Sequence, residues 1–212
     1  MSGEHLLAER RRILAAALPL VPFDGWTGRL LTEAAVIAGL EPSVALRAFP
    51  GGVVDLAVFH IQEADRLMLE ELALRDLPSL KIRDRIATAI QVRLEQQAGN
   101  REAIRRAVAL LALPGHAPLA LRSLYRTVDA IWHAAGDTAT DFNFYSKRLL
   151  LAGVYSATLL YWLEDKSEAH QRTWAFLDRR IGEIMRLQKF RGRLDRLAAD
   201  LPARFRRLRG KA

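Results

Sequence analysis

The sequence predicts an all-α protein. Half of its 212 residues are apolar, which is enough for a sizeable core, and the apolar residues recur at helical spacing between short breaks at Gly and Pro. Ala, Leu and Arg dominate the composition and β-branched residues are few, as is typical of helices. Cysteine is absent, so disulfides and thiol catalysis are excluded.

Ten helices are expected in order along the chain. They cover residues 5–20, 27–38, 43–49, 53–75, 80–97, 101–111, 117–135, 141–163, 167–189 and 191–209. Pro19, Gly39 and Pro50 end the first three, and Ser43 is expected to cap the third. Gly136 ends the seventh helix. The eighth, apolar nearly all round, is expected to be a buried central helix.

The first three helices form a helix-turn-helix pattern. The segments 13–22, 25–26, 31–40 and 43–49 together resemble the N-terminal module of the TetR regulator fold. We therefore expect a TetR-like helical bundle with an N-terminal helix-turn-helix-like module and a C-terminal amphipathic helix. The expected units are a module over 1–55, a helical body over 56–180 and a basic segment over 181–212.

The candidate recognition helix, 43–49, does not favour DNA binding. Reading a groove requires polar side chains and cations on the exposed face. This helix offers only Ser43 and Arg47, and the turn that follows, 50–55, has no Lys. Nucleic acid is therefore not an expected partner, and a TetR-like DNA-binding regulator is kept as the alternative function.

No catalytic centre is expected. The chain has neither a Gly-rich phosphate loop nor a G-x-S-x-G turn. None of its five histidines stands in the E-x-x-H arrangement of di-iron helix bundles. They are His5, His60, His116, His133 and His170. We expect no catalytic residue, no metal ligand and no cofactor.

The C-terminal segment is basic and amphipathic. Residues 179–212 carry 12 Lys/Arg and 3 Asp/Glu, whereas the rest of the chain carries 20 basic and 21 acidic residues. Apolar residues recur there at steps of 3 and 4, as in a helix that lies at a membrane surface. The expected membrane-binding residues are Phe190, Arg191, Arg193, Leu194, Leu197, Leu201 and Phe205. Alternatively, this segment folds back onto the body, pairs with a second copy as a homodimer, binds nucleic acid or serves solubility.

The most distinctive segment runs from residue 129 to residue 156. Asp141, Phe144, Tyr145 and Arg148 follow one another at i, i+3, i+4 and i+7, so they share a helix face. Two aromatics and an Arg beside a carboxylate are typical of an interface hot spot. The alternative is a set of core aromatics with an N-cap and an ion pair.

This segment resembles the signature of the Coq-nine family. The matching features are D-x-x-W over 129–132, A-G-D-x-x-T-D-F-N over 135–143, an aromatic pair, two basic residues and an apolar helix. The resemblance continues through 161–165 and 174–177. With the TetR-like start it covers most of the chain, and 60–115 is less distinctive.

The resemblance implies a non-catalytic accessory protein of ubiquinone biosynthesis. Its interior would hold an isoprenoid quinone or a phospholipid and its C-terminal helix would contact the membrane. A surface patch would dock the di-iron hydroxylase that performs the chemistry. The implied docking residues are Asp129, Ile131, Asp141, Phe144, Tyr145 and Arg148. The expected lipid-binding residues are Trp132, Tyr155, Leu159 and Trp162.

No targeting peptide or membrane-spanning segment is predicted. The longest uncharged apolar run, 149–163, is shorter than the roughly 18 residues that suggest a spanning helix, and charges bracket it. We expect a cytoplasmic protein of bacterial type, peripheral at the inner face of the membrane.

Overall fold

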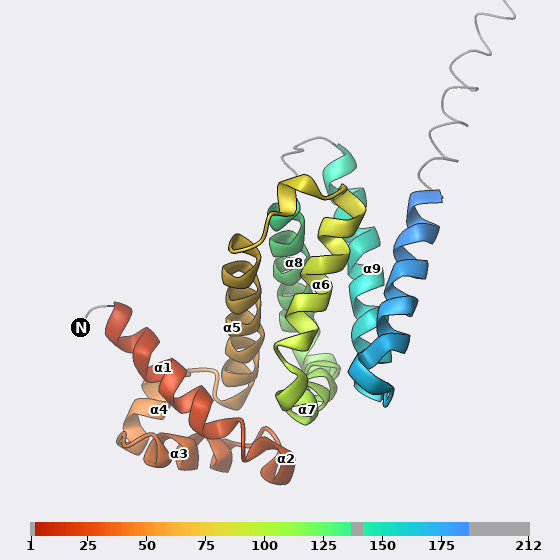
Figure 1. Ribbon diagram of the computed structural model, residues 1–212. Coiled ribbons are helices and arrows are strands. Elements are labelled where there is room, and N and C mark those ends of the chain that lie inside the picture. Colours follow the sequence, from red (N-terminus) through yellow and green to blue (C-terminus); the bar gives the residue numbers. More distant parts are fainter. Residues whose placement is uncertain (1–2, 137–141, 187–212) are drawn as a thin grey trace, which may run out of the picture.

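A computed structural model describes residues 3–136 and 142–186, and for 142–144 it describes the backbone alone (Figure 1). The helices are α1 (Gly3–Ala17), α2 (Val21–Asp24), α3 (Gly28–Ile37), α4 (Pro42–Ala48), α5 (Val53–Ala73), α6 (Ile82–Glu95), α7 (Arg101–Leu111), α8 (Ala117–Ala134) and α9 (Phe142–Glu164). Residues 171–186 form a further helix, here named the last described helix. The described residues contain no strand, and the predicted all-α class is confirmed.

Two local predictions were wrong. Helix α2 was not predicted. Pro22 lies in its first turn, where Pro is tolerated because its missing N–H would have no intrahelical partner. Ser43 does not cap α4. The N-cap is Glu41, which makes no side-chain cap bond, and Pro42 occupies the first turn.

The N-terminal module, α1 to α4, lies beside one end of α5 (Figure 1). Helices α5, α6, α8 and α9 stand side by side in the body, and α7 lies across the end nearest the module. The last described helix runs along α9 and ends at the opposite end of the body (Figure 1).

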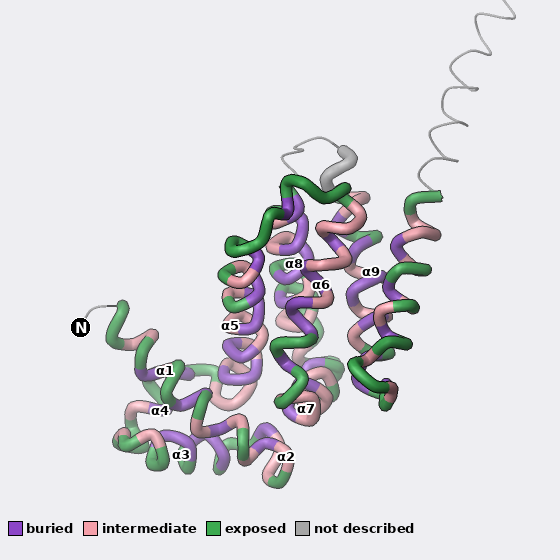
Figure 2. The backbone as a smooth tube through the Cα atoms, in the orientation of Figure 1, coloured by how far each residue is buried: buried purple, intermediate pink, exposed green. Residues whose placement is uncertain are grey.

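Two apolar cores hold these elements together, and their buried residues lie on the inward faces of the helices (Figure 2). Ile13, Leu30 and Phe49 belong to the core of the module, and Ile90 and Trp162 to that of the body. Helix α5 runs across the expected boundary at 55/56 and contributes to both cores. Because α5 is one unbroken helix that packs in both cores, it holds the module in a fixed position against the body.

Helix α7 also joins the two parts. The Trp26 indole N–H of the module donates to the Ala103 carbonyl at 3.0 Å. From the same helix, the Arg101 guanidinium donates to the Asp165 carbonyl at 2.8 Å and to the Trp162 carbonyl. The two Arg101 bonds reach carbonyls at and just after the C-terminal end of α9, where helical N–H donors run out.

Helix α9 is less buried than its composition predicted. Leu149 is 76% exposed and Leu160 is 55% exposed, whereas Leu151 and Trp162 are buried. The expectation of a helix buried all round was wrong, because α8 and the last described helix cover only part of its surface.

Candidate ligand cavity

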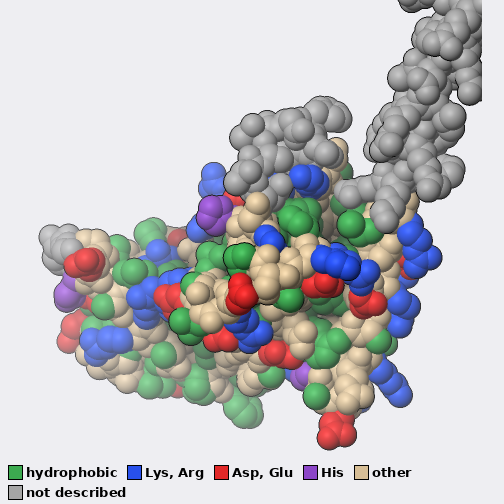
Figure 3. Space-filling model, turned by 45° about the horizontal axis from the view of Figure 1, so that its top comes forward, with side chains coloured by type: hydrophobic (Ala, Val, Ile, Leu, Met, Phe, Trp, Pro, Cys, Tyr) green, Lys and Arg blue, Asp and Glu red, His purple; other side chains and the backbone are tan. Residues whose placement is uncertain are grey.

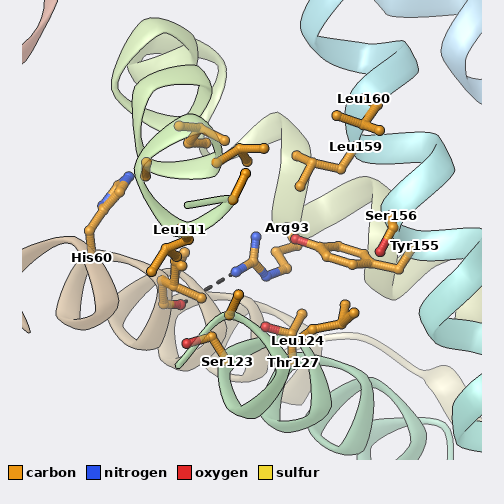
Figure 4. Close-up of a pocket in the computed structure, with 17 residues that line it drawn as sticks. His60, Arg93, Leu111, Ser123, Leu124, Thr127, Tyr155, Ser156, Leu159 and Leu160 are labelled. Atoms are coloured by element: carbon orange, nitrogen blue, oxygen red, sulfur yellow. Dashed lines mark hydrogen bonds between the residues drawn. The ribbon is translucent and has the colours of Figure 1, made fainter. Parts of the chain in front are cut away.

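A cavity of about 290 Å³ lies inside the body, and is named the main cavity below. Helices α5 to α9 all contribute to its wall (Figure 4). It is lined by His60, Ile61, Ala64, Arg93, Ile104, Ala107, Val108, Leu111, Ala112, Ala120, Ser123, Leu124, Thr127, Tyr155, Ser156, Leu159 and Leu160. The wall is mostly apolar with a few polar groups, which is the usual make-up of a small-molecule site.

The buried inner end of the main cavity carries most of its polar groups, whereas Ser156 is only half-buried. Arg93 is 4% exposed, and His60 and Tyr155 are also buried. The exposed lining residues, Ala112 and Leu160, are apolar and mark the mouth. The exposed part of the wall is therefore apolar, and the closed part combines these polar groups with apolar side chains such as Ile104 and Leu111.

A buried ion pair supports this inner end. Arg93 Nε donates to the Asp65 carboxylate at 2.7 Å, and the Thr127 hydroxyl donates to the same carboxylate at 3.0 Å. Arg93 Nη2 also reaches the Ile61 carbonyl at 3.4 Å. Removing only one partner of a buried pair typically costs about 3–5 kcal/mol, because the other charge stays buried. The pair thus fixes Arg93 and neutralises its charge.

Two further buried polar groups in the cavity wall carry no charge near neutral pH. Burial, and then the nearby Arg93 charge, lower the pKa of His60 to about 4. Burial raises the pKa of the Tyr155 hydroxyl, so this group keeps its proton. The Tyr155 ring lies 5.3 Å from the Arg93 guanidinium, as in a cation–π contact.

The four expected lipid-binding residues do not lie together. Tyr155 and Leu159 line the main cavity. Trp132 lines a second pocket of about 270 Å³ among α6, α8, α9 and the last described helix. Trp162 lines neither pocket. It has no exposed surface, and its ring packs near His170 and the Arg101 guanidinium.

Sequence reasoning missed His60 and Arg93, which come from the less distinctive stretch 60–115. A signal for Arg93 was present. It follows Ile86 and Ile90 at helical spacing, so it lies on the apolar stripe of α6. A cation in that position requires a buried partner, and Asp65 is that partner.

The expected docking residues are partly brought together. Arg148 of α9 donates to the Asp129 carboxylate of α8 at 2.7 Å, and Tyr145, one turn before Arg148, is 70% exposed. Ile131 has no exposed surface and belongs to the core. Asp141 and the Phe144 side chain lie outside the described residues.

The seven expected membrane-binding residues of the tail, residues 190–205, also lie outside the described part of the chain. Within the described part, no single helix is long and apolar enough to cross a membrane. Two pairs of consecutive helices, each bent at a short break, reach that length and apolar composition together. On the face shown in Figure 3, basic, acidic and hydrophobic side chains are interspersed. No group of three or more His, Cys, Asp or Glu side chains among the described residues could hold a metal ion.

The candidate recognition helix presents little that would contact DNA. The Arg47 guanidinium is paired with the Glu9 carboxylate of α1 at 3.0 and 3.1 Å. Leu46, on the outer surface of α4, is 69% exposed. The one cation of this helix is thus held by the module itself.

The fold is that of the TetR regulators. The structure matches the crystal structure of the TetR transcriptional regulator from Nitrosomonas europaea ATCC 19718 with a TM-score of 0.68 and 22% identity. The match covers 82% of this chain and 96% of that chain. At this identity the likeness shows the fold alone, and it confirms the predicted TetR-like architecture.

Within that class, residues 117–188 match the COQ9 family model. The chain is 36% identical over 184 residues to the ubiquinone biosynthesis protein COQ9, mitochondrial, of Rattus norvegicus, covering 84% of this chain and 59% of that protein. The human and Drosophila melanogaster proteins of the same name are 34% and 36% identical, with 84% and 85% of this chain covered and 58% and 56% of theirs. The chain thus belongs to the COQ9 family, as its motif indicated, and spans less than two thirds of these relatives.

Proposed function

We propose that this chain is a lipid-binding accessory protein of ubiquinone biosynthesis. It holds an isoprenoid quinone intermediate in the main cavity at a membrane and presents it to a hydroxylase, which carries out the chemistry. The main cavity, apolar and about 290 Å³ in volume, is the observation that carries this proposal. The relatives are ubiquinone biosynthesis proteins, and this supplies the pathway of the proposal.

Lipid extracted from the purified protein tests the proposal. Mass spectrometry is expected to find an isoprenoid lipid, because the cavity wall is apolar and its mouth opens beside exposed Leu160. An extract that contains no lipid, together with a tail that does not bind anionic vesicles, contradicts the proposal.

The docking of the hydroxylase is proposed to centre on Tyr145, beside the Asp129–Arg148 pair. An exposed aromatic next to a fixed charge pair is typical of a hot spot, and truncating a hot-spot residue costs about 2 kcal/mol or more. Tyr145→Ala is therefore expected to raise the dissociation constant for the hydroxylase roughly thirtyfold, as measured by biolayer interferometry. Tyr125→Ala, on the exposed surface of α8, is the matched control. Equal effects of the two variants contradict this docking site.

The membrane is proposed to be contacted by the basic amphipathic tail, in a protein peripheral at its inner face. The relatives are named as mitochondrial proteins. A TetR-like DNA-binding role is not proposed, because the Arg47 guanidinium is occupied by Glu9 and the helix around it presents Leu46.

A further inference from the structure

A pocket that holds a lipid tail inside and a headgroup at the surface would be apolar inside and polar at its mouth. The main cavity differs, because it has polar residues inside and apolar residues at its mouth. The buried lining residues include Arg93, Tyr155 and His60, and the exposed ones are Ala112 and Leu160. An amphiphile gains most when each of its ends meets a matching wall. This order therefore favours a polar group inside and an apolar chain at the mouth.

Polar atoms at the inner end have no partner among the described residues. Arg93 uses Nε and Nη2 for protein hydrogen bonds, and Nη1 makes none. The Tyr155 hydroxyl also makes no hydrogen bond with the described part of the chain. Figure 4 shows Arg93 and Tyr155 reaching toward one another from α6 and α9. Together they offer N–H and O–H donors to a ligand oxygen.

The charge balance at the inner end disfavours an anion. Arg93 is the one cation among the lining residues, and Asp65 already neutralises it at 2.7 Å. His60 carries no charge near neutral pH. A phosphate bound at this position would be a buried negative charge with no free cation to neutralise it. Burying such a charge is costly. A carbonyl or hydroxyl oxygen requires only the donors.

The volume sets how much of a ligand fits. A cavity of about 150 Å³ accepts a benzene ring. At about 290 Å³, the main cavity has room for a substituted ring and the beginning of a chain. The remainder of a long chain would leave through the mouth at Leu160.

We propose that the main cavity takes its ligand head-first. An uncharged ring that carries oxygen substituents is held at the inner end by the donors of Arg93 and Tyr155, and the apolar tail leaves past Leu159 and Leu160. Lipids with a phosphate headgroup are discriminated against. This inference rests on the proposed function, in which the cavity binds an isoprenoid quinone.

Three probes with the same tail test it: a decyl-substituted benzoquinone, decylbenzene and decyl phosphate. The variant is Tyr155→Phe in the full chain. Because the Tyr155 hydroxyl has no hydrogen-bond partner among the described residues, its removal leaves none of their polar groups unsatisfied and keeps the ring packing. Tyr161→Phe is the matched control, since Tyr161 lies on the same helix and stacks on Phe176 outside the cavity lining.

Calorimetry is expected to rank the quinone roughly tenfold or more tighter than decylbenzene, with decyl phosphate weakest. Tyr155→Phe should weaken quinone binding roughly three- to tenfold and leave decylbenzene binding unchanged. Tyr161→Phe should change neither. In the infrared, the carbonyl stretch of the bound quinone should lie lower in the wild-type protein than in Tyr155→Phe, which reports the lost hydrogen bond directly.

Two results would overturn the head-first orientation and leave ligand binding intact. One is decyl phosphate binding as tightly as the quinone. The other is equal binding of the quinone and decylbenzene, with no change in Tyr155→Phe. If none of the three probes binds, the proposed function fails, and the orientation fails with it.

Discussion

His60 lies in the wall of the main cavity, where burial and the Arg93 charge act on the same ring. Its neighbours are the Trp26 ring, at a centroid distance of 6.0 Å, and Arg93, which also lines the cavity and is paired with Asp65. The lowered pKa of about 4 means that folding holds this imidazole neutral. Stability therefore depends on pH through this residue.

The direction of this dependence follows from proton binding. Between pH 6.5 and about 4 the unfolded chain binds a proton at His60 that the folded chain does not, so stability falls on acidification through this window. The full shift corresponds to about 3 kcal/mol. We expect His60→Gln to remove this part of the pH dependence in urea unfolding curves, whereas His133→Gln, at an exposed position, should not. Indistinguishable pH profiles of wild type and His60→Gln would contradict the prediction.

The site could be predicted from sequence only where one segment carried it. Tyr155 lies within the distinctive segment and Leu159 just after it on the same apolar helix, and both line the cavity. His60 and Arg93 come from helices far apart in the sequence, which meet only through tertiary packing. No local pattern reports which helices will meet, so the polar inner end was not predicted.

At the scale of elements, the helices end close to the Gly and Pro residues that were used to predict their ends. Gly136, at a φ of +83°, and Gly39, at +68°, end helices where predicted. The last described helix begins later than expected, at residue 171, because Ala169 and His170 adopt left-handed conformations. Non-glycine residues rarely adopt these, so composition could not indicate this start.

Asp165 fixes the junction between α9 and the last described helix. Its carboxylate accepts hydrogen bonds from the backbone N–H groups of Ser167 at 2.8 Å and Thr173 at 2.9 Å, and from the Thr173 hydroxyl at 2.6 Å. Burial raises its pKa, but these bonds outweigh burial and hold the pKa well below the usual value. Its contribution to stability is thus present above pH 3.8 and is lost as the pH falls below it.

Asp165→Ala is expected to lower the free energy of unfolding by about 1–2 kcal/mol, because its carboxylate satisfies backbone N–H groups as an N-cap side chain does. Asp178→Ala, within the last described helix, removes an exposed ion pair with Arg83 and should cost less than about 1 kcal/mol. Chemical denaturation measures both. If the two substitutions cost the same, Asp165 does not hold the junction.

At the scale of the whole molecule, the TetR-like arrangement separates the proposed roles in space. The main cavity includes α7, at the end of the body next to the module, whereas the last described helix ends at the opposite end (Figure 1). The overall class could be predicted because helix periodicity and breaks are local. The main cavity could not, since whether apolar side chains pack solidly or leave space depends on packing among five helices.

Truncation after Arg186 tests the proposed role of the tail. The removed segment includes the apolar stripe and most of the basic excess of residues 179–212. Each Lys or Arg near an anionic surface contributes roughly 1 kcal/mol to binding. We expect the truncated protein to lose sedimentation with vesicles of anionic phospholipid while keeping its melting temperature. Unchanged vesicle binding would place the membrane contact elsewhere.

The most direct test of the central claim compares lipid content between two variants on adjacent residues of α8. Ala120 lines the main cavity, whereas Leu121 is exposed and does not. Mass spectrometry of lipid extracts should find isoprenoid lipid in the wild type and in Leu121→Trp, and strongly reduced lipid in Ala120→Trp, with all three equally helical by circular dichroism. Equal lipid content in the two folded variants would contradict the claim that the main cavity holds the ligand.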